Sequence, residues 1–279
     1  MTSHPLKDQI EKIAKGARLT ESAVAFRDHE TSEEFSLRGD QFFHAASTFK
    51  AAILLVLLKA AGAGEVDLKD HLQVRNRFLG LTSGEPFRIA RDRDGDSAVH
   101  GAIGKSLPLD QLARAMIVRS SNLATNLLLN FLTLEKIRGT LDACGVRGVE
   151  VRRGVEDLAA HEAGINNETT AKGMCALFER FLDEKTLPAA ERELGLEILH
   201  AQEFNRMLPA RLPKGVRVAH KTGEISTHCH DAGIVFPQGR KPYVISVLTE
   251  FGTDSENPQR AVAEISSVIF DHLTPRSHE

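Results

Sequence analysis

The feature that most constrains the fold of this 279-residue chain is an unbroken apolar run, AAILLVLL at residues 51–58, directly behind Ser47-Thr48-Phe49-Lys50. A run without a polar face predicts a helix that is buried on all sides. The run is far shorter than the roughly 20 residues that span a bilayer, so we expect a core helix. Ser47 and Lys50 stand three residues apart, which places them on one helix face, one turn from each other.

A serine beside a lysine is a possible nucleophile next to its base. A serine hydroxyl is a poor nucleophile at neutral pH, but a lysine that burial or another cation holds neutral can take its proton. If Ser47 lies at or near the first helical turn, the unpaired N–H groups and the positive helix end favour a developing oxyanion. The S-x-x-K spacing is common by chance, so this interpretation needs support from other parts of the chain.

Composition argues against several other classes of protein. The formal net charge is only -3 and no basic stripe occurs, so we expect neither nucleic acid nor a membrane as a partner. Trp is absent and Tyr243 is the single tyrosine, which disfavours a base-stacking platform. The three cysteines are too widely spaced for a disulfide framework or a zinc pattern. In a strand, His228 and His230 would share a face with Cys229 pointing away, so we expect local packing there, no metal site and no cofactor.

The predicted elements place strands near both ends of the chain and helices between them. A helix begins near Pro5, and a final helix begins behind Asn257-Pro258. Strands are predicted at residues 22–27, 34–44, 216–220, 232–236 and 243–250, and further helices at 107–119, 122–131, 169–182 and 189–208.

This order predicts an α+β fold of the α/β/α type. We expect one antiparallel sheet of about five strands, built from both termini and flanked by the N- and C-terminal helices, with an inserted all-helical subdomain. Residues 1–50 and 209–279 would form the sheet-containing subdomain and residues 51–208 the helical one, with the active site between them. Residues 71–105 are predicted to be irregular, and we interpret their charged string Arg91–Asp96 as a solvated loop.

Three short motifs stand in order along the chain: Ser47-Thr48-Phe49-Lys50, Ser120-Ser121-Asn122 and Lys221-Thr222-Gly223. This is the S-x-x-K, S-x-N, K-T-G series of a known group of catalytic motifs. The residues that flank each motif also match those found in this group. The chain therefore resembles the class A serine β-lactamases and their penicillin-binding relatives over nearly its whole length. Singly, each motif has a structural alternative, such as Ser120 acting as a helix cap.

The resemblance implies a role for each motif residue. Ser47 would attack a strained amide carbonyl and become acylated, while Lys50 takes or relays its proton. Ser120 would pass a proton to the leaving lactam nitrogen. The Asn122 amide would hold Lys50 and the side-chain amide of the substrate.

The third motif would bind the other end of the substrate. The resemblance implies that Lys221 supplies positive charge and Thr222 a hydroxyl for the substrate carboxylate, with Gly223 beside them. The backbone N–H groups of Ser47 and Glu224 would form the oxyanion hole.

A loop at residues 152–168 occupies the place where the resemblance implies a glutamate that activates the deacylating water. In the family that the chain resembles, this glutamate usually stands two residues after an Arg and directly before a Pro. Here Glu156 comes three residues after Arg153, and Asp157 replaces the Pro. We predict Glu156 as the base, with Asp157 second and a solvated loop as the remaining alternative. Arg153 could also pair with Glu168 across the neck of the loop.

Other departures affect the surroundings of the site. Ser121 stands where Asp is commonest in the family, which removes a carboxylate that braces the loops. The stretch between Ser47 and Ser120 is also longer than in the well-known enzymes, so we expect a reshaped rim of the cleft.

The sequence thus predicts a monomeric serine β-lactam hydrolase that forms and hydrolyses an acyl-enzyme on Ser47. One alternative is a penicillin-binding or esterase-like relative with slow or no β-lactam turnover. Another is a catalytically silent binding protein of the same fold. No apolar leader follows Met1, so we expect a cytoplasmic protein, or a periplasmic one if a leader has been removed.

Overall fold

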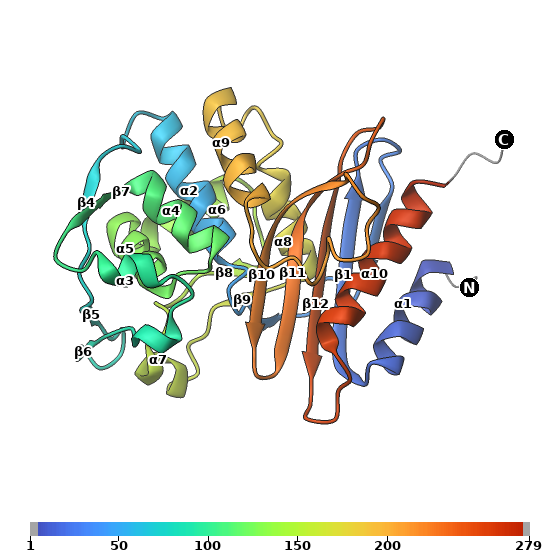
Figure 1. Cartoon of the computed structure of the whole chain (residues 1–279), viewed down its shortest axis with the longest axis horizontal. Helices are drawn as coiled ribbons and strands as arrows, with labels where there is room; N and C mark the ends of the chain where they lie inside the picture. Colours follow the sequence, from blue (N-terminus) through green and yellow to red (C-terminus); the bar gives the residue numbers. More distant parts are fainter. Residues whose placement is uncertain (1–4, 276–279) are drawn as a thin grey trace.

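The computed structural model describes residues 5–275 and has a five-stranded antiparallel sheet at its centre, as predicted (Figure 1). Strands from both ends of the chain form the sheet. They lie in the order β10 (Arg217–Ile225), β11 (His228–Phe236), β12 (Tyr243–Phe251), β1 (Leu19–Asp28) and β2 (Glu34–Leu37).

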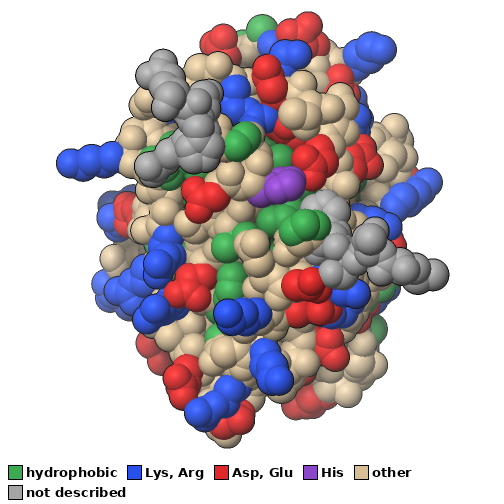
Figure 2. All heavy atoms as spheres, turned by 90° about the vertical axis from the view of Figure 1, so that its right-hand side faces the viewer, with side chains coloured by type: hydrophobic (Ala, Val, Ile, Leu, Met, Phe, Trp, Pro, Cys, Tyr) green, Lys and Arg blue, Asp and Glu red, His purple; other side chains and the backbone are tan. Residues whose placement is uncertain are grey.

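Two terminal helices, α1 (Pro5–Gly16) and α10 (Pro258–Leu273), pack together on one face of the sheet (Figure 1). The Asn257 side chain caps α10 by accepting from the Arg260 amide at 3.1 Å, as the Asn-Pro pair predicts. On the outer surface of this layer, Lys, Arg, Asp and Glu side chains are interspersed around a few apolar ones (Figure 2). The opposite face of the sheet is covered by α8 (Ala171–Glu179).

The predicted buried helix is α2 (Lys50–Gly62), and no residue from 51 to 58 is more than 1% exposed. Helices contact it from all around, which is why its sequence has no polar face. These are α8 together with α4 (Leu109–Val118), α5 (Asn122–Leu132), α6 (Leu134–Ala143) and α9 (Ala189–His200). Replacing one of its leucines by alanine would cost about 2–5 kcal/mol of stability.

The single strand predicted at residues 34–44 is wrong, because the chain turns between β2 and β3 (Phe43–His44). Arg38 adopts a left-handed φ of 50° there, and a Cβ on Gly39 would lie 2.1 Å from Ser36 Oγ. A glycine therefore fits where the chain folds back on itself. After the turn, β3 pairs with β9 (Glu168–Thr169), and β9 pairs with β8 (Val149–Glu150). This small sheet joins the segment before Ser47 to the end of the 152–168 loop.

Other predicted boundaries also shift. The helix predicted at 189–208 ends at His200, α6 was not predicted, and the 152–168 loop contains α7 (Leu158–Glu162). Residues 71–105 are irregular for the most part but contain short elements. These are β4 (His71–Gln73), β5 (Phe78–Leu79), β6 (Pro86–Phe87), η1 (Arg91–Arg93) and α3 (Ser97–Gly101), and β7 (Ser106–Pro108) follows them. Among residues 5–275, no helix is long and apolar enough to cross a membrane.

Candidate active site

Ser47 lies in the turn between β3 and α2. Ala46 before it has a left-handed φ of 47°, and the Lys50 amide donates to the Ser47 carbonyl at 3.2 Å. This tight turn places Ser47 one turn ahead of Lys50, as the spacing predicts. The Ser47 N–H makes no hydrogen bond within the described part of the chain, so it is available to a ligand oxygen.

Strand β10 brings the third motif directly against this turn. A Cβ on Gly223 would lie 2.9 Å from the Ser47 nitrogen, which explains why the motif needs a glycine there. The residues on either side, Thr222 and Glu224, line the same cavity as Ser47. The N–H of Ser47 and the backbone at Glu224 thus lie close to each other, on facing segments.

Lys50 connects the first motif to the second. Its side chain is fully buried, and Nζ donates to Ser120 O at 2.8 Å, Ser120 Oγ at 3.1 Å and Asn122 Oδ1 at 2.8 Å. Burial, together with the charge of Lys221, holds the pKa of Lys50 well below its ordinary value. A lysine in this state can accept a proton, which an exposed ammonium near neutral pH cannot.

Lys221 is also fully buried and lies behind the cavity wall. Its Nζ donates to Thr222 O at 2.9 Å, and burial lowers its pKa to about 7 despite the opposing charge of Asp231. Asp231 is itself buried and accepts from His220 Nδ1 at 2.9 Å and from the Leu208 amide at 3.0 Å. Lys221 is thus not among the residues that line the cavity around Ser47, and Asp231 is a buried carboxylate near it that no motif pointed to.

Two cavities meet at Ser47 and Glu224. One, of about 490 Å³, is lined by both of these residues and by Ser120 and Thr222. The other, of about 600 Å³, is lined by Ser47, Glu224 and some residues of the 152–168 loop, with Glu156 among them. A substrate bound over Ser47 can thus extend in two directions.

The loop that carries Glu156 is held on both sides of that residue. Asn126 Oδ1 accepts from the Val155 amide at 2.8 Å, and Asn126 Nδ2 donates to the Val155 carbonyl at 2.9 Å. Asp157 caps α7 by accepting from the Ala160 amide and also accepts from the Leu81 amide at 2.8 Å. Glu156 between them has a left-handed φ of 61° and pairs with Arg93 at 3.1 Å.

The ion pair suggested between Arg153 and Glu168 is wrong, because Arg152 pairs with Glu168 instead. Arg152 forms the ion pair with Glu168, whereas Arg153 donates to the Ile165 carbonyl at 2.8 Å and to Asn166 Oδ1 at 3.3 Å. The neck of the loop is therefore closed by two adjacent arginines, one through an ion pair and one through neutral oxygens.

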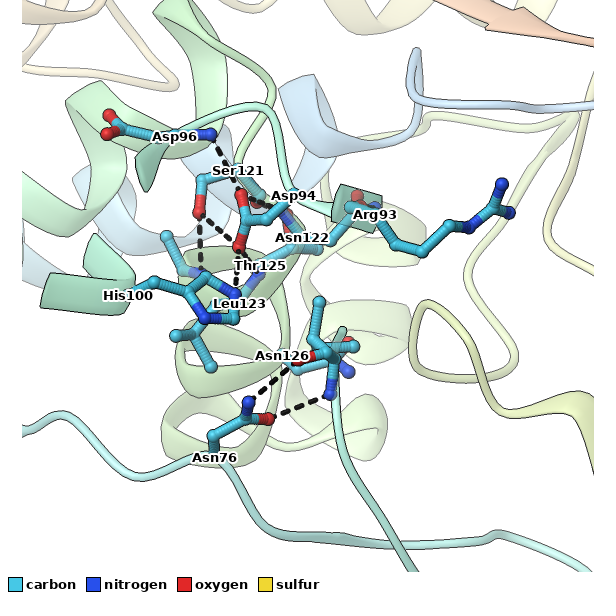
Figure 3. Close-up of polar contacts among 12 residues, drawn as sticks. Asn76, Arg93, Asp94, Asp96, His100, Ser121, Asn122, Leu123, Thr125 and Asn126 are labelled. Atoms are coloured by element: carbon cyan, nitrogen blue, oxygen red, sulfur yellow. Dashed lines mark hydrogen bonds and ion pairs between the residues drawn. The ribbon is translucent and has the colours of Figure 1, made fainter. Parts of the chain in front are cut away.

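The interpretation of Arg91–Asp96 as a solvated loop is wrong for Asp94, whose side chain is fully buried, and for Asp96, which is buried as the N-cap of α3. Figure 3 shows the Asp94 carboxylate against the residues that begin α5. This carboxylate accepts from the amides of Asn122 at 3.2 Å and Leu123 at 2.9 Å and from Ser121 Oγ at 3.3 Å. His100 Nε2 lies 3.2 Å from Asp94 Oδ2. Asp94 thus caps α5 from a distant segment and supplies a carboxylate beside Ser121, where the sequence suggested that one was missing.

The stabilising role of the Asp94 carboxylate can be tested by moving an aspartate from position 94 to position 121 of the middle motif. We expect Asp94→Ser to lower the free energy of unfolding by about 2 kcal/mol or more, because buried amides lose a charged acceptor. The double variant Asp94→Ser/Ser121→Asp should recover part of this loss, since Ser121 already caps the Ala124 amide. Chemical denaturation of the three proteins measures both effects. A double variant no more stable than Asp94→Ser would contradict the relocation.

His228 and His230 share a face of β11, as predicted, and their ring centroids lie 5.4 Å apart. His44 on β3 lies 6.0 Å from His228, and His161 on α7 lies 6.4 Å from His44. Within residues 5–275, no group of His, Cys, Asp and Glu side chains is placed to hold a metal ion. The imidazoles instead pack where β3, β11 and α7 meet, and His44 Nδ1 accepts from the Ala46 amide at 3.1 Å.

This cluster predicts a loss of stability in acid. Burial, helped by the nearby Arg153, lowers the pKa of His44 to about 4, and burial lowers that of His230 to about 3. Between pH 6.5 and 4 the unfolded chain binds protons that the native state does not, so the free energy of unfolding falls as pH falls. We expect His44 to contribute about 2 kcal/mol of this fall, allowing for its partial exposure.

The histidine prediction is checked by unfolding at a series of pH values. His44→Asn keeps an acceptor near the Ala46 amide without the titrating ring, so its stability should fall less between pH 6.5 and 4. His71→Asn, at an exposed position on β4, is the matched control and should follow the wild-type curve. Equal pH dependence in all three proteins would rule out the contribution of His44.

Comparisons with known proteins agree over nearly the whole chain. The model of the "Beta-lactamase enzyme family" matches residues 5–273. The chain is 23% identical over 277 residues to Beta-lactamase PSE-4 of Pseudomonas aeruginosa, covering 96% of this chain and 92% of that one. An ancestral class A β-lactamase superposes with a TM-score of 0.82 at 24% identity over 96% of this chain and 99% of the other.

The structure of PBP-A is also similar, with a TM-score of 0.80 at 24% identity and 98% coverage of both chains. A PBP-A variant with one leucine replaced by glutamate has been captured as an acyl-enzyme complex with penicillin G, and it superposes with a TM-score of 0.76 at 23% identity over 96% of each chain. The five-stranded sheet and its surrounding helices are therefore the fold of class A β-lactamases.

Proposed function

The chain belongs to the beta-lactamase enzyme family, and from this we propose that it is a serine hydrolase that opens β-lactam amides through an acyl-enzyme on Ser47. The observation that carries the proposal is the buried Lys50. Its amine bridges Ser120 and Asn122 within one turn of Ser47, and its pKa is lowered by burial and by a second lysine. This is the environment that a lysine needs to activate a serine hydroxyl.

Acylation would proceed by proton transfers among these groups. Ser47 Oγ forms a bond to the lactam carbonyl carbon as its proton passes to Lys50 Nζ, and the N–H groups of Ser47 and Glu224 stabilise the oxyanion. When the carbon–nitrogen bond breaks, Ser120 Oγ donates its proton to the lactam nitrogen and recovers one from Lys50, to which it is hydrogen-bonded. The positive charge of Lys221 and the Thr222 hydroxyl would bind the carboxylate of the substrate.

Deacylation would need a water molecule activated by Glu156. This residue lines the 600 Å³ cavity together with Ser47, so a water between them could lose its proton to the carboxylate and attack the ester carbon. The ester bond then breaks and the proton returns to Ser47 Oγ. We propose Glu156 in preference to Asp157, because both oxygens of Asp157 already accept backbone amides.

A penicillin-binding relative that acylates without turnover is the second candidate. The observation that favours it is that the Glu156 carboxylate makes no hydrogen bond to Ser47 or Lys50 within the described residues. PBP-A, with the same fold, forms a penicillin acyl-enzyme in a variant that gained a glutamate. An esterase-like relative and a silent binding protein are the further alternatives.

Intact-mass spectrometry after mixing with a penicillin separates these functions. A transient adduct of one penicillin mass, accompanied by the hydrolysed product, is expected for the hydrolase. A persistent adduct would identify the penicillin-binding type. No adduct would overturn the proposal, and hydrolysis of a simple chromogenic ester would then distinguish an esterase from a silent protein.

A further inference from the structure

Arg93 contacts both Asn122, which is hydrogen-bonded to Lys50, and Glu156, the proposed deacylating base. Its carbonyl oxygen accepts from Asn122 Nδ2 at 2.6 Å, and Asn122 Oδ1 accepts from Lys50 Nζ at 2.8 Å. Its guanidinium donates to Glu156 Oε1 at 3.1 Å. The backbone of Arg93 therefore orients the amide beside Lys50, while its side chain contacts the loop carboxylate.

The backbone of Arg93 is anchored independently of its side chain. Asp94, the next residue, is buried and bonded to the start of α5 (Figure 3). A Cβ on Gly95 would lie 1.9 Å from the Arg119 carbonyl, so the segment packs directly on the chain before Ser120. A substitution that shortens or neutralises the Arg93 side chain should thus leave its carbonyl in contact with Asn122.

Glu156 has little freedom except in its side chain. Asn126 holds Val155 through two hydrogen bonds, and Asp157 is fixed by its bonds to the Leu81 and Ala160 amides. The remaining variable is the direction of the Glu156 carboxylate. Arg93 binds one of its oxygens, and the other is left for a water in the cavity that Ser47 also lines.

We propose that Arg93 is a positioning residue for deacylation, whose guanidinium holds the Glu156 carboxylate in the direction from which it can activate water. This inference rests on the proposed function, in which Glu156 is the base. The Arg93 side chain is 64% exposed, so the ion pair contributes little to folding. The direction of a catalytic group matters far more, because a misplacement of about 1 Å can cost about 100-fold in rate.

Arg93→Met tests this role, with Arg93→Lys as the conservative variant. Both would be mixed with a penicillin, and the rise and decay of the adduct would be followed by intact-mass spectrometry. We expect Arg93→Met to acylate within about twofold of wild type while its adduct decays about tenfold or more slowly. Arg93→Lys should recover part of the decay rate, since an ammonium can still attract the carboxylate.

Arg91→Met is the matched control, because it removes the same charge from the same short helix at a residue that lines neither cavity. It should behave as wild type, and the melting temperatures of all four proteins should agree. Equal decay in Arg93→Met and Arg91→Met would overturn the inference. So would a parallel loss of acylation and deacylation in Arg93→Met, which indicates a structural role. If wild type forms no adduct at all, the proposed function itself fails and this role falls with it.

Discussion

Ser47→Ala is expected to abolish the covalent adduct with a penicillin. No other nucleophile at this position could form the ester, and losing the nucleophile of a serine hydrolase lowers the rate by about 10⁶-fold. Because Ser47 lies in a turn that backbone hydrogen bonds define, the alanine variant should fold normally. Intact mass after mixing measures the adduct, and the melting temperature shows that the fold persists.

Ser226→Ala is the control for this prediction. Ser226 is an exposed serine that lines the same 600 Å³ cavity, so it reports whether any nearby hydroxyl can be acylated. Its variant should form the adduct at the wild-type rate. A full adduct on Ser47→Ala, or one that peptide mapping assigns to another residue, would show that Ser47 is not the nucleophile.

Glu156→Gln is expected to permit acylation and then trap the acyl-enzyme. In the proposed mechanism acylation depends on Lys50 and Ser120, and Glu156 is hydrogen-bonded to neither of them. Loss of the Glu156 charge lowers the pKa of Lys50 still further, whereas the amide cannot accept a proton from the deacylating water. Loss of a general base typically costs about 10²–10⁴-fold, so the adduct should persist long after the wild-type adduct has decayed. The measurement is the fraction of protein acylated against time.

Glu162→Gln is the corresponding control, because it changes an exposed glutamate of the same loop. It should turn over as wild type does. Full turnover by Glu156→Gln would exclude Glu156 as the base. Deacylation would then have to depend on Asp157, at the expense of its bonds to two backbone amides, or on Lys50.

The elements that the sequence predicts well are those whose own residues determine them. The buried α2 follows from an apolar run, and α10 follows from an Asn-Pro cap and an apolar stripe. The central sheet was predicted with the right number of strands, since each strand is bounded by turn residues. The division into two subdomains at residues 50 and 208 remains a prediction.

Contacts between segments that are distant in the chain could not be predicted from the sequence. The pairing of β3 with β9 involves two residues on each strand, too few to leave a pattern in the sequence. The turn at Arg38 and Gly39 that separates β2 from β3 depends on close backbone packing, which a single strand-like run conceals. A buried Asn126 among leucines was a signal that could have been used, because a polar residue on an apolar helix face needs a partner.

The motif residues and their supports differ in the same way. The three motifs identified the side chains around Ser47, because their chemistry requires particular residue types at fixed spacing. Arg93 and Asp94 looked like any solvated charge run, since nothing local distinguishes a carboxylate that reaches a helix 27 residues away. Only the folded chain shows that this run belongs to the site.

Asp94 therefore shows that a carboxylate at the start of α5 can be supplied by a residue that lies outside the middle motif in the sequence. A search that demands an acidic residue in the middle motif would pass over this protein, although the charge reaches the start of α5 from an earlier segment. Among distant relatives, a missing motif letter is then no proof of lost chemistry. Structural comparisons of where charged groups lie would group together proteins that comparisons of sequence motifs separate.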